Sequence, residues 1–141
     1  RGRRVLSYLA QPEEVDLAGL AGFETAYPVS ERGGRMEAYI PGGEEPFEPG
    51  FSGIRQPRRE TGTLVTPETL DIVLAPCVAF DRKCRRLGHG GGYYDRYLEG
   101  CPQALVIAVA FEAQRLDGIV TDAHDRPVHI VVTEKRVYLP E

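Results

Sequence analysis

Apolar positions along the chain follow two patterns, and each pattern predicts a different kind of β-strand. Near-continuous apolar runs at Leu70–Pro76, Ala104–Phe111 and His129–Glu134 are typical of strands buried on both faces of a parallel sheet. Shorter runs with alternating apolar and polar residues predict strands with one face toward solvent. The strands we expect, in chain order, are Val5–Ala10, Glu24–Val29, Arg35–Ile40, Leu70–Pro76, Ala104–Phe111, His129–Glu134 and Arg136–Leu139.

Two helices are expected between these strands, at Glu13–Gly22 and Tyr93–Gly100, and each run ends at a glycine. The segment Pro41–Pro57 is rich in Gly, Pro and Glu and is predicted to be a loop. Strands that alternate with helices indicate an α/β fold with a mostly parallel sheet. The length of 141 residues favours a single domain over residues 1–141.

Composition narrows the classes of function. The chain is 42% hydrophobic and 27% charged with a net charge of −4, and it has no extended basic stripe, which disfavours nucleic-acid binding. No apolar run approaches the roughly 18 residues that span a bilayer. The three cysteines are an odd number without a C-x-x-C pair, which disfavours a disulfide framework or structural zinc site and favours a reducing cytoplasm.

The stretch "RLGHGGGYYDRYL", Arg86–Leu98, is the strongest candidate for chemistry. Glycines between a buried strand and a helix let the backbone approach a ligand and turn N–H groups toward an anion. The helix start adds a positive end, and Arg85 and Arg86 are placed to neutralise phosphate oxygens. The pattern predicts a phosphate-binding loop without a Walker A ending. A tight surface turn is the alternative.

Asp95 follows the glycines directly, and a carboxylate beside a bound phosphate needs a cation between them. Magnesium binds one or two carboxylates together with phosphate oxygens, so Asp95 is a candidate ligand, with Asp122 or Asp125 as the second. The alternative is that Asp95 only charges the first turn of the helix.

The stretch "LDIVLAPCVAFDRKCRRLGHGGGYYDRYL" resembles the signature of the 5-formyltetrahydrofolate cyclo-ligase family, also called methenyltetrahydrofolate synthetases. The "GIRQP", "AFEAQ" and "AHDRP" segments fit the same family, so the resemblance spans nearly the whole chain. It implies a three-layer α/β/α sandwich similar to sugar-phosphate isomerases and CoA transferases. It also implies an ATP- and Mg²⁺-dependent conversion of 5-formyltetrahydrofolate to 5,10-methenyltetrahydrofolate.

The resemblance also assigns roles to individual residues, although it assigns no catalytic nucleophile. It implies an ATP site at Arg86, Leu87, Gly88, His89, Gly90, Gly91, Gly92, Tyr93 and Tyr94. It implies a folate site at Leu9, Glu14, His89, Gly90, Gly91, Gly92 and Tyr93, and magnesium at Asp95 and Asp125. Glu14 would hydrogen-bond the pterin ring, and its alternative role is that of an acid at a helix start.

Alternatives remain, because family members carry an N-terminal helical region with basic residues that reach ATP, and no such helix precedes Val5. We expect that this segment belongs to a longer natural chain. A relative that binds nucleotide or folate without turnover is the second interpretation. Sugar-phosphate chemistry is the third, with Asp81 and Glu112 as its only acid–base candidates. We expect a cytoplasmic monomer that acts on small molecules, not on nucleic acid or membranes.

Overall fold

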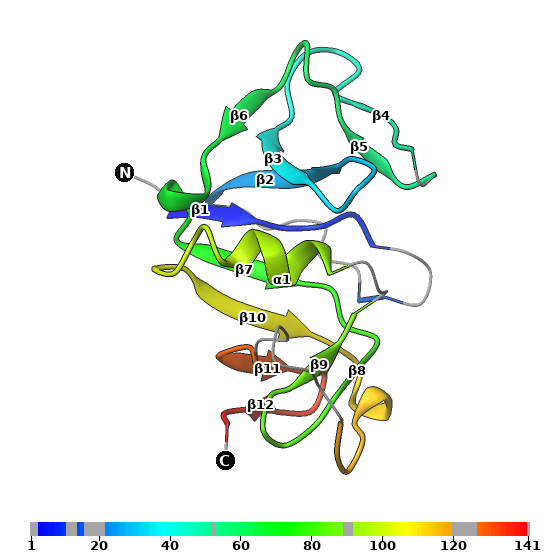
Figure 1. Ribbon diagram of the computed structural model, residues 1–141, viewed down its shortest axis with the longest axis vertical. Helices are drawn as coiled ribbons and strands as arrows, with labels where there is room; N and C mark the ends of the chain where they lie inside the picture. The colour runs from blue at the N-terminus through cyan, green and yellow to red at the C-terminus, as the bar shows by residue number, and fades with distance from the viewer. Residues whose placement is uncertain are drawn as a thin grey trace.

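The computed structural model describes residues 3–10, 14–15, 22–51, 53–88, 92–119 and 127–140. Eight strands form one sheet in the order β12-β11-β10-β7-β1-β2-β3-β6 (Figure 1). In chain order they are β1 (Arg3–Leu6), β2 (Phe23–Ser30), β3 (Met36–Ile40), β6 (Thr63–Val65), β7 (Ile72–Ala75), β10 (Leu105–Val109), β11 (Ile130–Val132) and β12 (Val137–Tyr138).

The neighbouring strands β2, β1, β7, β10 and β11 pair in parallel, whereas β3, β6 and β12 join the two sides antiparallel. The α/β fold with a mostly parallel central sheet is therefore confirmed. All seven strands that the apolar pattern predicts are present, with bounds that differ by a few residues. The first of them begins and ends earlier than expected, so the chain leaves the sheet before Tyr8.

Side chains on both faces of the central strands are apolar, which is why these strands could be recognised in the sequence. Leu6 and Val73 are paired neighbours and are fully buried in the main core cluster. Val5 and Leu74 point to the opposite face and form a smaller cluster. Burying a side chain of this size stabilises the fold by about 1.5–3 kcal/mol. Both faces of the sheet are therefore apolar, as the central sheet of a three-layer sandwich requires.

The helices in the described residues are short. The α-helix α1 (Tyr93–Leu98) lies over the main cluster and buries Tyr97 and Leu98 there (Figure 1). The other two are the 3-10 helices η1 (Pro67–Thr69) and η2 (Glu112–Gln114). None of the described helices has the length and apolar character that crossing a bilayer demands. The helix expected at Glu13–Gly22 lies mostly outside the described residues.

Two short hairpins lie outside the main sheet. The prediction that Pro41–Pro57 is a loop is wrong, because β4 (Phe47–Pro49) and β5 (Arg55–Pro57) pair there antiparallel. The rings of Tyr27 and Phe47 meet edge to face at 5.6 Å, so tertiary packing against β2 stabilises strands that are too short to show a pattern. The second hairpin joins β8 (Ala79–Phe80) to β9 (Arg86–Leu87).

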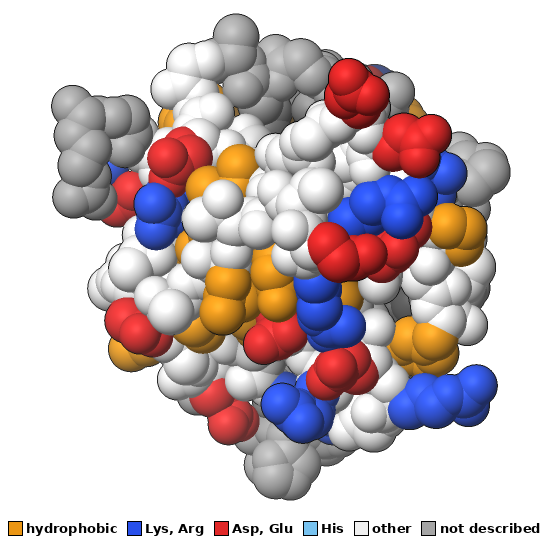
Figure 2. Space-filling model, turned by 90° about the horizontal axis from the view of Figure 1, so that it is seen from above, with side chains coloured by type: hydrophobic (Ala, Val, Ile, Leu, Met, Phe, Trp, Pro, Cys, Tyr) orange, Lys and Arg blue, Asp and Glu red, His pale blue; other side chains and the backbone are white. Residues whose placement is uncertain are grey.

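Charged side chains of opposite sign lie next to one another on the face seen from above in Figure 2. The segment from β2 to β6 supplies several such pairs, because Arg59 contacts Glu31 and Glu37, and Arg58 contacts Glu48. These side chains are about one-third exposed, and pairs of this kind contribute at most about 1 kcal/mol each. The core, not these ion pairs, therefore determines the stability of the fold.

Candidate active site

The order of the strands in the sheet predicts, independently of any sequence motif, where a ligand would bind. The chain passes from β1 to β2 on one side, whereas β7 lies on the other side of β1. In open α/β sheets, ligands bind outside the carboxyl ends of the strands at such a switch point. The carboxyl end of β1 leads into Ser7 and Tyr8, and that of β7 leads into Pro76 and Cys77. A ligand site is therefore expected between these two segments.

Arg86 lies at this switch point because the β8–β9 hairpin folds back to the end of β7. Its Nη1 donates to the carbonyl oxygen of Pro76 at 3.3 Å, and the side chain is only 6% exposed. The Nε of Arg86 has no hydrogen-bond partner within the described residues. Buried donors are nearly always satisfied in native proteins, so this spare N–H indicates that an anionic ligand belongs here.

The first turn of α1 brings two more polar side chains to Arg86. Asp95 Oδ1 lies 3.9 Å from Arg86 Nη2, and the Arg86 Cζ lies 5.7 Å from the centre of the Tyr94 ring. The Tyr94 hydroxyl is buried and, in the part of the chain that the structure describes, has no partner. Burial raises the pKa of Tyr94, the nearby Arg86 lowers it, and the charge of Glu14 raises it. The predicted residues Arg86, Tyr94 and Asp95 therefore converge on one place, and Glu14 is near enough to influence the pKa of Tyr94.

Two of the predicted glycines, Gly88 and Gly92, have surroundings that a side chain would disturb. A Cβ at Gly88 would lie 2.7 Å from Arg86 Nη1, so a side chain there would push the end of the guanidinium aside. Gly92 has a φ of 66° directly before α1, a left-handed conformation that side chains disfavour. His89, Gly90, Gly91 and Asp125 lie outside the described residues. The predicted anion nest therefore stays a prediction at its centre.

Other predicted residues are engaged elsewhere or lie at the margin of the site. The Tyr93 hydroxyl donates to the Glu31 carbonyl at 2.8 Å, and Arg96 covers its ring at 5.9 Å. Leu87 is half exposed on β9, and Leu9 is partly buried after Tyr8. Arg85 is engaged with the protein itself, because its guanidinium pairs with Asp81 at 2.8 Å, so its expected role toward phosphate stays a prediction.

Asp81 is a buried structural carboxylate, not a free base. Its two oxygens accept hydrogen bonds from the backbone N–H groups of Lys83, Arg85 and Ile119 and from Arg85 Nε, at 2.8–3.1 Å. Burial alone would raise the pKa of Asp81, but these hydrogen bonds together hold it below its usual range. The carboxylate stays ionised and bound at neutral pH, so it holds the turn between β8 and β9 in place.

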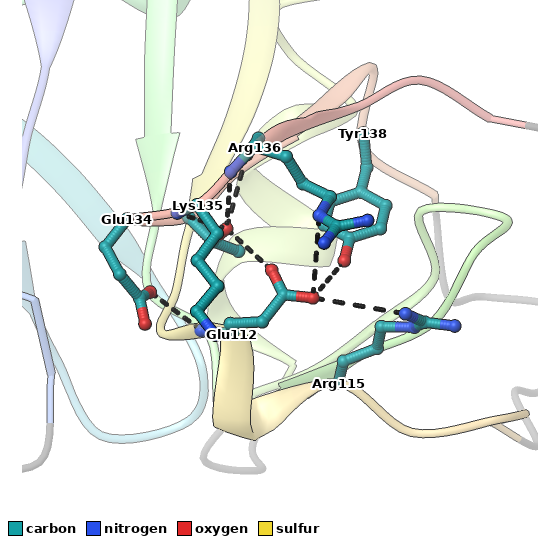
Figure 3. Close-up of polar contacts among 7 residues, drawn as sticks. Glu112, Arg115, Glu134, Lys135, Arg136 and Tyr138 are labelled. Atoms are coloured by element: carbon teal, nitrogen blue, oxygen red, sulfur yellow. Dashed lines mark hydrogen bonds and ion pairs between the residues drawn. The ribbon is translucent and has the colours of Figure 1, made fainter.

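Glu112 is held in a similar way at the carboxyl end of β10 (Figure 3). It accepts hydrogen bonds from the Tyr138 hydroxyl and from Thr133 Oγ1, the latter at 2.8 Å, and Arg115 and Arg136 lie within 4.0 Å. The Tyr138 hydrogen bond is the main cause of the lowered pKa of Glu112. Because Asp81 and Glu112 are both ionised and occupied, the sugar-phosphate interpretation loses its two candidates.

Cys77 borders the site but is not a nucleophile. Burial raises the pKa of its thiol to about 11, although the nearby Arg86 lowers it somewhat. The thiol is therefore protonated at neutral pH and behaves as a small apolar group. Cys77, Cys84 and Cys101 are all buried, and none of the three forms a disulfide.

Tyr8, Pro76 and Cys77 are the residues at this end of the sheet to which sequence reasoning gave no role in the site. Tyr8 is far from Pro76 and Cys77 in sequence, and the two segments follow neighbouring strands because β1 and β7 pair in parallel, with Val5 opposite Ile72. The available signal was the strand order. Once two predicted parallel strands are assigned to neighbouring positions, the residues after them become candidates for the site.

The described residues contain no group of three or more His, Cys, Asp or Glu side chains that would hold a metal alone. Asp95 is a single, partly exposed carboxylate beside the buried Arg86. This arrangement fits magnesium in the way that it binds with nucleotides, where phosphate oxygens and water supply most ligands. Asp95 therefore stays the predicted magnesium ligand, and Asp125 lies outside the described residues.

Several known proteins are similar to this chain in sequence or in fold. The model of the 5-formyltetrahydrofolate cyclo-ligase family matches residues 24–134. The enzyme named 5-formyltetrahydrofolate cyclo-ligase from Haemophilus influenzae is 35% identical over 92 residues, which cover 64% of this chain and 48% of that enzyme. The enzyme of the same name from Mus musculus is 36% identical over 92 residues, which cover 62% of this chain and 42% of that enzyme. The NMR structure of Aquifex aeolicus 5,10-methenyltetrahydrofolate synthetase superposes with a TM-score of 0.81 at 34% identity, covering 98% of this chain and 72% of that one. The chain spans about half the length of the two sequence relatives.

Proposed function

The chain belongs to the 5-formyltetrahydrofolate cyclo-ligase family, and we propose that it converts 5-formyltetrahydrofolate to 5,10-methenyltetrahydrofolate with ATP and Mg²⁺, releasing ADP and phosphate. The observation that carries this proposal is Arg86. It is a buried guanidinium with a spare donor at the switch point of the sheet, inside the region that the family model matches.

The proposed reaction has two steps. The formyl oxygen attacks the γ-phosphorus of ATP, the bond to the β-phosphate oxygen breaks, and ADP leaves. N10 of the folate then attacks the activated carbon and loses its proton, and phosphate leaves with the former formyl oxygen. The protein need not supply a nucleophile, because phosphoryl transfer requires mainly positioning and charge stabilisation. Arg86 provides that charge in a site shielded from water.

In this proposal, the folate ring would lie between Glu14 and the start of α1. Glu14 is near enough to Tyr94 to influence the pKa of its hydroxyl. A carboxylate can accept hydrogen bonds from both the amino group and a ring N–H of a pterin. The buried Tyr94 hydroxyl can donate a hydrogen bond to an acceptor atom of the ring. Asp95 would hold Mg²⁺, which when bound neutralises phosphate oxygens.

The reaction itself is tested with the longest natural form of the protein, 5-formyltetrahydrofolate and Mg²⁺. We expect the absorbance of methenyltetrahydrofolate to rise only when ATP is present. In the variant Asp95→Asn, the Mg²⁺ concentration that gives half the maximal rate should increase on the order of tenfold, because one anionic ligand is lost.

The outcomes separate the two remaining interpretations. Product formation that requires ATP establishes the ligase, and an unchanged Mg²⁺ requirement in Asp95→Asn removes Asp95 from the metal site. If the protein binds ATP or folate in equilibrium dialysis but forms no product, it is the non-catalytic relative. Glu99→Gln, an exposed acid beyond the end of α1, serves as the matched control.

The variant Tyr94→Phe tests whether the buried hydroxyl serves the substrate. Without ligand, removing a hydroxyl that has no partner should leave the free energy of unfolding unchanged or raise it by about 1 kcal/mol. With substrate, KM for 5-formyltetrahydrofolate should rise about fivefold to tenfold, because the variant loses the binding free energy of one hydrogen bond. Urea unfolding and steady-state kinetics measure the two effects.

Tyr97→Phe is the matched control for this experiment. The Tyr97 hydroxyl is also buried and without a partner in the described residues, but Tyr97 lies on the face of α1 that packs into the main core cluster, near Cys101. This variant should show the same small change in stability with KM unaltered. An equal change of KM in both variants would show that the hydroxyl of Tyr94 has no special role.

A further inference from the structure

The start of α1 contacts the turn between β2 and β3, which comprises residues 31–35. The Tyr93 hydroxyl donates to the Glu31 carbonyl at 2.8 Å, and Arg96 Nε donates to the Gly34 carbonyl at 3.4 Å. The Arg96 guanidinium also lies over the Tyr93 ring, with Cζ 5.9 Å from the ring centre. Tyr93 and Arg96 are therefore two anchors that join one short helix to the same turn.

The Arg96 guanidinium lies between the backbone of this turn and the backbone just before α1. A Cβ at Gly34 would be 2.5 Å from Arg96 Cζ and nearer still to Arg96 Nη2. A Cβ at Gly92 would be 3.2 Å from Arg96 Nη1. Gly34 is buried, whereas the adjacent Gly33 is exposed and has nothing within 4 Å of the place that a Cβ would take. The position of the guanidinium therefore depends on the absence of a side chain at Gly34 but not at Gly33.

The two anchors determine where the first turn of α1 lies. The helix has six residues, and an isolated helix of this length is unstable in water, so tertiary contacts fix its position. Tyr97 and Leu98 are buried in the core and hold its far end. Tyr94 and Asp95 lie between the anchors in sequence and approach Arg86. Successive side chains of a helix point in different directions, so a rotation that releases the anchors would turn both residues away from Arg86.

We propose that Arg96, seated against Gly34, is a positioning residue for the proposed reaction, and that it keeps the first turn of α1 where Tyr94 can donate to the folate. The inference rests on the proposed function. Arg96 contacts neither substrate in this role and acts through the helix that carries Tyr94. A site of this kind has to be held within about 0.5 Å of its productive geometry by the residues around it. A small displacement of the first turn therefore weakens folate binding without unfolding the protein.

Alanine at the two adjacent glycines separates the contact with Arg96 from strain in the turn. Gly33 and Gly34 have φ values of 87° and 89°, so alanine strains the backbone similarly at both, but only Gly34→Ala adds an atom where the guanidinium lies. The dissociation constant of 5-formyltetrahydrofolate, measured by equilibrium dialysis without turnover, should rise about fivefold in Gly34→Ala and less than about twofold in Gly33→Ala. The midpoint of urea unfolding should fall similarly in both variants. An equal rise of the dissociation constant in both would overturn the proposal, because backbone strain alone would explain it.

A double-mutant cycle tests whether Gly34 acts through Arg96. Arg96→Ala should raise the same dissociation constant about fivefold, and adding Gly34→Ala should change it less than about twofold further, since the group that the new methyl displaces is already absent. Two independent effects that multiply to about 25-fold would reject the proposal. A protein that shows the expected shifts but forms no product retains the positioning role and rejects the ligase. Product formation that requires ATP, with the dissociation constant unchanged in Arg96→Ala, rejects the positioning role alone.

Discussion

Replacing Arg86 with alanine should lower kcat by at least about 100-fold, which corresponds to roughly 3 kcal/mol of lost transition-state stabilisation. The reason is that the guanidinium is 6% exposed, so its charge acts where water cannot screen it. Its Nε has no partner in the described residues and is available for a ligand oxygen. The measurement is the steady-state rate of methenyltetrahydrofolate formation at saturating ATP and folate.

Two variants control for charge and for fold. Arg86→Lys keeps the charge but loses the forked donors, so its rate should fall between the wild type and Arg86→Ala. Arg35→Ala removes an arginine that is 79% exposed and should leave kcat unchanged. Circular dichroism verifies that each variant is folded. A kcat in Arg86→Ala within threefold of the wild-type value, by the same assay, would remove Arg86 from the reaction.

The central strands could be predicted from the sequence because they are buried on both faces, so that adjacent residues in them are apolar. In β7, Val73 and Leu74 point to opposite clusters, and both positions must be apolar. The hairpins of β4–β5 and β8–β9 could not be predicted in the same way. Their strands have two or three residues each and depend on partners elsewhere, such as Tyr27 for Phe47. Strands this short have too few residues to show an alternation of apolar and polar positions.

The site was predictable only where it is contiguous in the chain. Arg86, Tyr94 and Asp95 lie within one motif, and the structure brings the three side chains together. Tyr93 belongs to the same motif but is engaged with Glu31, because successive residues at a helix start point in different directions. The pairing of Arg85 with Asp81 was not predicted from the sequence. Its partner Asp81 is four residues away, and burial of that carboxylate, not charge alone, determines the pairing.

The variant Asp81→Asn should lower the free energy of unfolding by about 3–5 kcal/mol at neutral pH, because it breaks a buried ion pair and leaves donors without an acceptor. The wild-type carboxylate is 1% exposed and accepts from three backbone N–H groups as well as from Arg85. These bonds hold the turn that precedes Arg86. Urea unfolding at pH 7 measures the difference.

The control is an exposed ion pair. Glu24 contacts Arg4, and its side chain is 48% exposed, so Glu24→Gln should cost less than about 1 kcal/mol. A loss in Asp81→Asn no greater than that in Glu24→Gln would mean that the Asp81 network contributes nothing beyond a surface pair.

The difference in stability between the wild type and Asp81→Asn should depend on pH. The pKa of Asp81 is lower in the folded protein than the value near 3.9 of an unfolded chain, because the hydrogen bonds to the carboxylate outweigh the effect of burial. The folded state therefore binds this proton less readily than the unfolded state does. The stabilisation is fully present above about pH 5 and is lost as the pH falls through the folded pKa.

Unfolding measured from pH 7 to pH 2 should show a difference in the free energy of unfolding between wild type and Asp81→Asn that is constant at first and then narrows, since a protonated aspartate resembles asparagine. A gap that stays constant to the lowest pH would show that the charge of Asp81 is not what stabilises the turn.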